Sequence, residues 1–495
     1  MNKLISRCGT PVCVGWALAV LLGVRLLSLG LYPLMDNTEA RYADISRVMF
    51  VLGDWVTPWF DVGVPFWGKP PLSFWTTAVS YSVFGVNEFA ARLPHFLAAL
   101  GVGWLAWGWA LQRSRQEALT AAALLAGCSL MLVSAGAVMT DMTLAVGTTL
   151  AMRGFWLGLH GMAGQRQREG WLFFIGLSIG LLAKGPLVLV LAGLPLGLWT
   201  LFNRQLGRVW RDLPWLRGGL LMLLLAGPWY ALAEWRTPGF LDYFLLGEHW
   251  HRFVTSGWIG DRYGVAHSAR WGSIWLYALV AVLPWALLLP LAGWAWRPAT
   301  AQAAAPEPAL QRYLILWSLA PLVFFTFARN ILWTYALPAL PALALLGAGW
   351  LNRRADPQRV NRLLTGGLLL SAALFAGFVM FMNMKSMEDF HTTRALVAHT
   401  AELNNTHRSA PPKPLVFYPA RPYSAAFYSR GQAEQITSAE ALHARLLKQA
   451  VYLAVDTRSA AALPATLPTS LHSEPVARHG DYSLLLITPV SVMNQ

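Results

Sequence analysis

Residues 11–42 read PVCVGWALAVLLGVRLLSLGLYPLMDNTEARY, an apolar run that ends in a cluster of charged side chains. The run is long enough to cross a bilayer as a helix, because such a helix needs roughly 20 apolar residues. Immediately after it, Asp36, Glu39 and Arg41 follow within six positions. Asp36 and Glu39 have the spacing of a helix capping box, and they also fit the start of an active site at a membrane surface. Both interpretations are open at this point.

The composition of the whole chain repeats the pattern of its first span. Of the 495 residues, 56% are hydrophobic and 13% are charged, whereas soluble proteins carry about 25% charged residues. The sequence therefore predicts an all-α polytopic membrane protein with about 11 to 13 transmembrane helices. We expect spans near residues 11–32, 90–111, 117–139, 142–160, 171–183, 186–202, 216–233, 273–294, 311–328, 332–350 and 363–383, with a partial or re-entrant helix at 71–86.

The arginines indicate which ends of the spans face the cytoplasm. Loops around Arg113, Arg166 and Arg208 are rich in arginine and alternate with loops that hold most of the acids before the tail. Because an excess of Lys and Arg marks cytoplasmic loops, the net charge of +14 is a topology signal. It predicts no nucleic-acid partner. The loops 33–89 and 234–272 are then expected outside the cytoplasm.

The tail differs in kind from the rest of the chain. Residues 385–495 are polar and contain short β-like runs at 414–418, 450–455 and 483–488, separated by helical stretches. This pattern predicts a small soluble α/β domain. We expect it to follow a transmembrane domain formed by residues 1–384, on the same side of the membrane as the loop 33–89.

The loop 33–89 carries residues that suit a membrane interface. Apolar residues at helical spacing predict an amphipathic helix near its start, and several tryptophans follow, a residue favoured at interfaces. Lys69 stands directly before two prolines. Because proline restricts the residue before it to extended backbone, the side chain of Lys69 can be aimed.

Further charged residues interrupt the apolar segments at the same expected depth. They are Asp141, Lys184 and the group Glu248, His249 and Arg252. A charge at membrane depth is costly unless it is paired or faces water, so these residues are functional candidates. A buried structural pair would also explain Asp141 and Lys184, and a solvated turn would explain Glu248 and His249.

Carboxylates and cations at the outer end of a helical bundle predict group transfer. A carboxylate can act as a general base on an acceptor hydroxyl. Lysine and arginine bind phosphate and stabilise the charge that develops when a phosphate is the leaving group. Outside the cytoplasm no nucleotide donor is at hand, so a lipid-linked donor is the physically sensible one.

At these residues the sequence resembles the bacterial members of the aminoarabinose transferase and protein O-mannosyltransferase superfamily, of GT-C fold. The stretches that carry the resemblance are TEARYADISRVM, GDWVTPWFD, GVPFWGKPPLSFW, FGVNEFAARL, LLAKGP, EHWHRF and TYALPALPALALL, in this order over roughly residues 30–350. The resemblance implies a glycosyltransferase of the bacterial inner membrane with its active site and tail domain on the periplasmic side. It would move a sugar, with inversion, from undecaprenyl phosphate to lipid A, lipopolysaccharide or another envelope glycan, with no organic cofactor.

The resemblance also implies roles for individual residues. The catalytic candidates are Asp36, Glu39 and Lys69, to which the charge of Asp141 at membrane depth adds a fourth, and the candidates for binding the donor phosphate and lipid are Lys184, Arg252, Arg270, Arg41, Tyr42 and Tyr335. Thr38 stands where the family has an aspartate, so the choice between Asp36 and Glu39 as catalytic carboxylate is open. Gly68 stands where the family has a glutamate that, with the histidine matched by His249, binds a metal in some relatives. This departure removes one of the two ligands, and one protein ligand seldom holds a metal ion. Glu248, His251 or a first-loop carboxylate could compensate, so Glu248 and His249 are the candidate ligands of a divalent metal ion whose presence the sequence leaves open.

Two alternatives to this function remain. A protein O-glycosyltransferase of the same fold differs only in its acceptor. A transporter or flippase for a lipid-linked sugar belongs to another class, but transporters often show internal repeats and polar residues near the bilayer midplane. The sequence shows no repeat and gathers its polar residues at one face.

Overall fold

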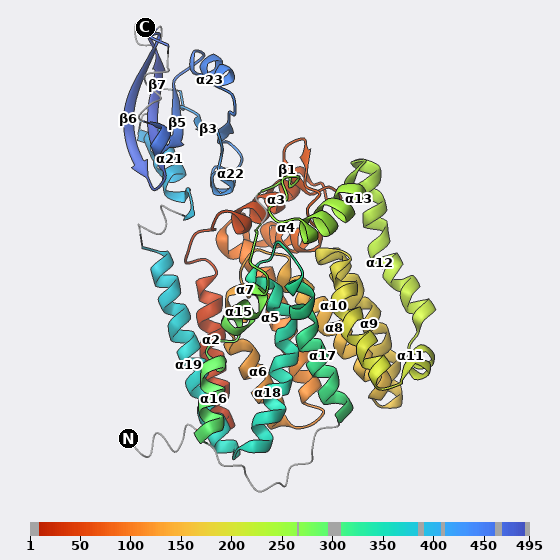
Figure 1. Ribbon diagram of the computed structural model, residues 1–495. Helices are drawn as coiled ribbons and strands as arrows, with labels where there is room; N and C mark the ends of the chain where they lie inside the picture. The colour runs from red at the N-terminus through yellow and green to blue at the C-terminus, as the bar shows by residue number, and fades with distance from the viewer. Residues whose placement is uncertain are drawn as a thin grey trace, which may run out of the picture. The chain divides into compact units, whose positions relative to one another are not determined.

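The structure is a computed structural model that describes residues 9–264, 267–295, 308–384, 391–406, 411–460 and 468–490 (Figure 1). The chain forms two compact units. One unit joins Met1–Leu29 to Val48–Gly377, and the other joins Gly30–Arg47 to Phe378–Gln495. The sequence places Gly30–Arg47 in the transmembrane domain, whereas in the structure this segment packs with the tail. The boundary at residues 384 and 385 therefore stays a prediction.

The first unit is helical. Its α-helices are α2 (Pro11–Ser28), α3 (Thr38–Leu52, which begins in the second unit), α4 (Leu72–Phe84), α5 (Glu88–Ala110), α6 (Arg115–Gly127), α7 (Ser129–Ser134), α8 (Asp141–His160), α9 (Ala163–Lys184), α10 (Leu187–Phe202), α11 (Leu206–Asp212), α12 (Trp215–Arg236), α13 (Phe240–Asp242), α14 (Arg252–Val254), α15 (Ser273–Ala281), α16 (Trp285–Ala295), α17 (Pro308–Thr326), α18 (Leu340–Arg354) and α19 (Pro357–Met382, which ends in the second unit). A π-helix, η1 (Tyr243–His251), a 3-10 helix, η2 (Trp333–Ala339), and a hairpin of β1 (Trp59–Asp61) and β2 (Val64–Pro65) complete it.

Six helical segments among the described residues are long and apolar enough to cross a membrane, and a seventh is added if α15 and α16, which meet at 76°, count as one span. This number is lower than the 11 to 13 spans expected from the sequence. The expected span 117–139 is divided between α6 and α7, and α10 has only 16 residues. Helices α8 and α9 are longer but less apolar, and they carry the buried ion pair of Arg153 with Glu169 at 2.9 Å. The polytopic helical class is confirmed.

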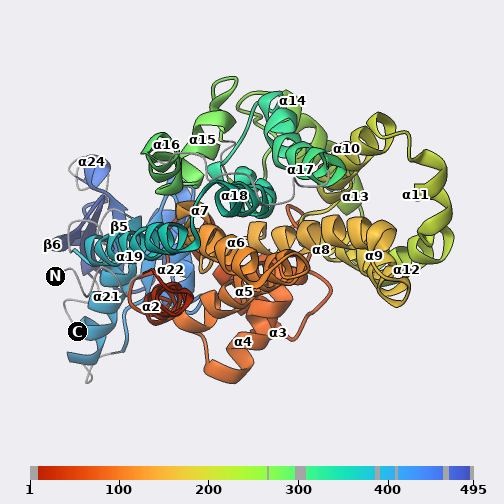
Figure 2. The ribbon, with the colours of Figure 1, turned by 90° about the horizontal axis from the view of Figure 1, so that it is seen from below.

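Close packing of α8 against α9 brings together a charged residue at the start of α8 and another at the end of α9. Seen from below, in Figure 2, the two helices lie side by side. Glycines allow the approach, since a Cβ on Gly147 would lie 2.7 Å from the carbonyl oxygen of Gly176. Small residues at a helix interface let the backbones come close. Because a short turn joins the two helices, the first residue of α8, Asp141, meets the last residue of α9, Lys184.

The second unit contains a five-stranded mixed sheet in the order β4-β3-β5-β7-β6. The strands are β3 (Leu415–Tyr418), β4 (Glu434–Gln435), β5 (Val451–Asp456), β6 (Leu471–His479) and β7 (Tyr482–Pro489), and the helices are α21 (Arg394–Thr406), α22 (Tyr423–Tyr428), α23 (Ala439–Leu446) and α24 (Thr457–Ala460). Strand β3 runs parallel to β4 and β5, and β7 runs antiparallel to β5 and β6. The three β-like runs of the sequence are β3, β5 and β7, so the α/β tail is confirmed. The edge strand β6 escaped prediction because it is mostly polar and contains Pro475.

Candidate functional site

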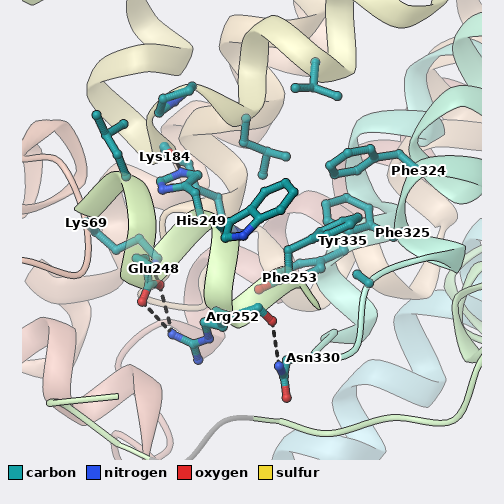
Figure 3. A pocket seen from close by; sticks show the side chains of 16 residues that line it. Lys69, Lys184, Glu248, His249, Arg252, Phe253, Phe324, Phe325, Asn330 and Tyr335 are labelled. Atoms are coloured by element: carbon teal, nitrogen blue, oxygen red, sulfur yellow. Dashed lines mark hydrogen bonds and ion pairs between the residues drawn. The ribbon is translucent and has the colours of Figure 1, made fainter. Parts of the chain in front are cut away.

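A cavity of about 410 Å³ lies in the first unit where several helices end (Figure 3). Six of the residues predicted from the sequence line it: Lys69, Lys184, Glu248, His249, Arg252 and Tyr335. They come from the turn before α4, the end of α9, the η1–α14 segment and η2. The sequence thus identified charged residues from distant segments that the fold brings to one place.

The cavity is apolar on one side and charged on the other. Figure 3 shows Phe324, Phe325 and Tyr335 together, across from Lys69 and Glu248. The rest of the lining is mostly aliphatic and aromatic: Pro186, Leu187, Val190, Leu245, Trp250, Phe253 and Ala328. Ligand sites commonly combine apolar walls with a few placed polar groups. The arrangement suits a ligand that joins a hydrocarbon chain to an anionic group.

Glu248 holds two cations at the charged side. Lys69 forms an ion pair with it, and Nη1 of Arg252 donates to both of its carboxylate oxygens at 2.9 Å. Burial alone would raise the pKa of Glu248, but the nearby charges of Lys69 and Arg252 outweigh burial and lower that pKa to about 2. Nη1 of Arg252 also lies 3.4 Å from Oδ2 of Asp261. Glu248 is therefore an anion at neutral pH that holds Lys69 and Arg252 at the cavity wall.

Lys184 forms a second, separate pair. Its Nζ lies 2.7 Å from Oδ1 of Asp141, and both side chains are buried. The same ammonium stands 4.3 Å from the centre of the Tyr335 ring. Lys184 lines the cavity, whereas Asp141 does not. The ammonium group of the pair is therefore the one at the cavity wall, and its carboxylate partner lies outside the lining. The buried ion pair is therefore present, and the functional roles of Lys184 and Asp141 stay predictions.

The residues predicted to hold a metal do not fit that task. Both ring nitrogens of His249 lie near backbone carbonyl oxygens, Nδ1 at 2.7 Å from Phe244 and Nε2 at 3.1 Å from Lys184. The oxygens of Glu248 are occupied by Lys69 and Arg252. A Cβ on Gly68 would lie 2.8 Å from the end of the Phe66 ring, so a longer side chain there would require that ring to move. Within the described ranges, no three His, Cys, Asp or Glu residues cluster as a metal site would require.

The first-loop candidates Asp36, Glu39, Arg41 and Tyr42 belong to the second unit. Asp36 accepts hydrogen bonds from the backbone N–H of Ser424, at 2.8 Å, and from its hydroxyl. Oε2 of Glu39 accepts from the backbone N–H of Met35 at 3.1 Å. Because the Asp36 carboxylate accepts from Ser424, the structure does not support a capping box of Asp36 with Glu39. The catalytic roles of these residues stay predictions.

Two other cationic candidates have different surroundings. The Arg41 guanidinium lies 5.3 Å from the centre of the Tyr42 ring and 5.4 Å from the centre of the Tyr423 ring, and both cation–π contacts stabilise its charge. Arg270 is exposed and does not line the cavity. Its carbonyl oxygen accepts a hydrogen bond from Ser273 instead. Its predicted role in donor binding therefore has no support from the cavity geometry.

Asn330 lines the cavity and was missed by the sequence analysis. Its amide group donates to the carbonyl oxygens of Arg252, at 2.6 Å, and Thr255, at 2.7 Å. Its own oxygen accepts from Gly257 at 3.2 Å. Asn330 thus fixes the segment that carries Arg252. The sequence did contain a signal for Asn330, because Arg329 and Asn330 are polar residues between two apolar spans.

The fold and the cavity together define a polytopic membrane protein with a cationic site for an amphipathic ligand. Residues 16–244 match the family model described as dolichyl-phosphate-mannose-protein mannosyltransferase. An undecaprenyl phosphate-alpha-4-amino-4-deoxy-L-arabinose arabinosyl transferase from Pseudomonas fluorescens (strain Pf0-1) is 30% identical over 77% of this chain and 68% of its own length. The chain belongs to this family of GT-C glycosyltransferases, which confirms the resemblance seen in the motifs.

Other relatives show how far the likeness extends. The corresponding transferase from Erwinia tasmaniensis is 32% identical over 65% of this chain, and the match spans 56% of that relative's length. The crystal structure of ArnT from Cupriavidus metallidurans bound to undecaprenyl phosphate superposes with a TM-score of 0.80 and covers 96% of this chain and 97% of that one. At 22% sequence identity this likeness shows the fold. The apo structure of the same protein gives a TM-score of 0.77.

Proposed function

We propose that this protein is an integral membrane glycosyltransferase that moves a sugar from undecaprenyl phosphate to an envelope glycolipid such as lipid A or lipopolysaccharide. The observation that carries the proposal is the cavity that joins apolar walls to Lys69, Lys184 and Arg252. The apolar walls suit the prenyl chain, and the three cations suit the phosphate. The family relatives named for undecaprenyl-phosphate aminoarabinose transfer support the same donor.

The reaction uses the cations and carboxylates in separate tasks. The acceptor hydroxyl attacks the anomeric carbon while the bond from that carbon to the phosphate oxygen breaks, so the configuration inverts. The bonding electrons pass to undecaprenyl phosphate, which leaves with an additional negative charge that Lys184 and Arg252 stabilise. The hydroxyl proton passes to a first-loop carboxylate, Asp36 or Glu39, acting as general base.

We infer that the cavity opens on the periplasmic side of a bacterial inner membrane. Arg166 and Arg168 lie near the start of α9, and Lys184 is its last residue. A helix of this length separates its ends by about 33 Å, close to the thickness of a bilayer core. If the arginines mark the cytoplasmic end, Lys184 and the cavity lie at the opposite membrane surface.

Transfer in detergent tests this proposal directly. The purified full-length protein would be incubated with undecaprenyl-phosphate 4-amino-4-deoxy-L-arabinose and lipid A, and the products identified by mass spectrometry. We expect a new glycolipid and free undecaprenyl phosphate. A glycoprotein product from a membrane extract would favour the O-glycosyltransferase alternative. Absence of any new glycosidic bond with a panel of undecaprenyl-phosphate sugars and envelope acceptors would refute the proposal.

A further inference from the structure

Ser424 is the centre of a buried hydrogen-bond network in the second unit. Its backbone N–H donates to Oδ1 of Asp36 at 2.8 Å, and its hydroxyl donates to Oδ2 of the same carboxylate. The hydroxyl oxygen also lies 3.0 Å from the backbone N–H of Thr393 and 2.8 Å from the Thr393 hydroxyl. Ser424 has no exposed surface, and Thr393 is buried. The network thus joins the first outer loop to the starts of α21 and α22.

The donors and acceptors of this network can be assigned completely. A serine hydroxyl has one proton and two acceptor lone pairs. Since its proton goes to Asp36, Ser424 must accept both hydrogen bonds from Thr393. The Asp36 carboxylate then accepts on each of its oxygens, and Ser424 uses its full capacity. Satisfied buried networks of this kind fix one arrangement of the groups that they join.

Other contacts hold the same segment against the tail. The backbone N–H of Leu34 donates to the hydroxyl of Tyr428 at 2.7 Å. The backbone N–H of Asp36 donates to the carbonyl oxygen of His391 at 2.9 Å. At the far end of the segment, Arg47 donates to the carbonyl oxygen of Arg430 at 3.3 Å. The tail therefore contacts the segment before, at and after the acidic motif.

We propose that Asp36 and Ser424 form a latch by which the C-terminal domain positions the catalytic segment, and that Glu39 is the carboxylate that takes the acceptor proton. This inference rests on the proposed function and assigns roles to residues of the second unit. Ser424 donates to both Asp36 oxygens, and hydrogen bonds to the ionised carboxylate favour the charged form, which suits a positioning role for Asp36. Glu39 and Arg41 lie on α3 directly after the latch. Ser424 is then a positioning residue, and the C-terminal domain is part of the catalytic apparatus.

A double-mutant cycle tests the latch in the full-length protein. Asp36→Asn, Ser424→Ala and the double variant would be compared in sugar transfer from undecaprenyl phosphate. We expect each single variant to lower kcat by about tenfold or more, because small displacements of a catalytic group have effects of this size. The KM for the donor should stay within about twofold, since the cavity is unchanged. The double variant should be no slower than the slower single variant, because both changes break one interaction.

Three further variants sharpen the result. Ser424→Thr keeps a hydroxyl and should recover much of the lost kcat. Ser470→Ala changes an exposed serine of the same domain and should leave kcat unaltered. Glu39→Gln should abolish turnover in the presence of an intact latch. If Asp36→Asn abolishes turnover while Ser424→Ala equals the wild type, Asp36 acts directly and the latch is refuted. Additive losses in the double variant would refute it as well.

Hydrogen exchange measured by mass spectrometry separates the latch from the proposed function. Ser424→Ala should raise amide exchange in residues 30–47 and leave exchange around Lys184 unchanged. This readout needs no substrate. A wild-type protein that transfers no sugar would refute the proposed function, while the exchange data would still decide the latch. Unchanged exchange in residues 30–47 would overturn the latch even in an active enzyme.

Discussion

The cavity in the first unit and the Ser424 network in the second unit use buried polar groups in opposite ways. In the network, each hydrogen bond of the Ser424 hydroxyl has a partner within the protein, and the groups specify how one segment is held. In the cavity, Lys184, Lys69 and Arg252 are paired with carboxylates yet still line a space of ligand size. Polar groups whose hydrogen bonds are all made within the protein fix its structure. Cations that are paired on one side and border an apolar cavity on the other can still contact a ligand. This difference is the basis on which we propose a positioning role for Ser424 and a ligand-binding role for Lys184, Lys69 and Arg252.

The largest expected effect is loss of the Lys184 ammonium. Lys184→Met keeps the length of the side chain and removes its charge, and we expect turnover to fall by about 10²–10³-fold, the loss typical of removing one charge-stabilising group. The measurement is kcat for transfer from undecaprenyl-phosphate sugar. Lys184→Arg should retain part of the activity, since it keeps a cation.

A compensating change separates binding from structural pairing. Lys184→Met leaves the buried Asp141 without its partner, so the single variant should also unfold more easily. Adding Asp141→Asn removes the unpaired charge and should restore thermal stability. Activity should stay low in the double variant. Restored activity would mean that the pair is structural, and the contrast with the Ser424 network would fail at Lys184.

The second effect concerns the stability of the cavity wall. Glu248→Gln leaves the partly buried Lys69 and Arg252 without their shared carboxylate, and we expect a cost of about 3 kcal/mol in the free energy of unfolding, the lower end of the range for a broken buried pair. Denaturation in detergent, followed by tryptophan fluorescence, measures it. Asp212→Asn is a matched control, because Asp212 pairs with the more exposed Arg208 and Arg211. A loss of the same size in both variants would show that the pairing at Glu248 is no stronger than a surface ion pair.

The pH dependence of this wall follows from the same carboxylate. The pKa of Glu248 falls from its ordinary value of 4.5 to about 2, chiefly because Lys69 and Arg252 outweigh the effect of burial. A carboxylate with a lowered pKa contributes stability that is fully present above its unfolded value and is lost as the pH falls toward the folded value. The wild type should therefore lose stability below about pH 4.5. Glu248→Gln should show a smaller loss over that interval.

The third effect concerns the hydrogen bond that Thr393 contributes to the Ser424 network. Thr393→Val keeps the shape of the side chain but removes the hydroxyl that donates to Ser424. A buried acceptor that loses its donor costs about 1–3 kcal/mol, so amide exchange in residues 30–47 should rise, with a smaller fall in kcat than for Ser424→Ala. Thr437→Val, at an exposed position, provides the control. Equal exchange in the two variants would show that the Thr393 hydroxyl adds nothing to the latch.

The contrast between the two regions also explains what the sequence could predict. Lys184 and Glu248 were found because a charge in an apolar stretch is conspicuous and costly. Ser424 gave no signal, because it is one small polar residue in a polar tail and its partner Asp36 lies 388 positions away. The helical class followed from composition, but the number of spans did not, because breaks such as the one between α6 and α7 depend on packing. The sequence therefore predicted residues that are unusual for their local surroundings, but it did not predict contacts between residues far apart in the chain.

The smallest expected effect is the response to removal of divalent metal. Incubation with EDTA should change kcat by less than about twofold, since metal sites normally need three or more placed ligands. Here the Glu248 oxygens accept from Lys69 and Arg252, and the ring nitrogens of His249 face backbone carbonyls. His249→Gln should therefore lower thermal stability, and its activity should not respond to added Mg²⁺, Mn²⁺ or Zn²⁺. An enzyme that loses turnover in EDTA and regains it with one of these ions would show that His249 turns into the cavity as a ligand. In that case the cavity wall would have to rearrange when the metal binds.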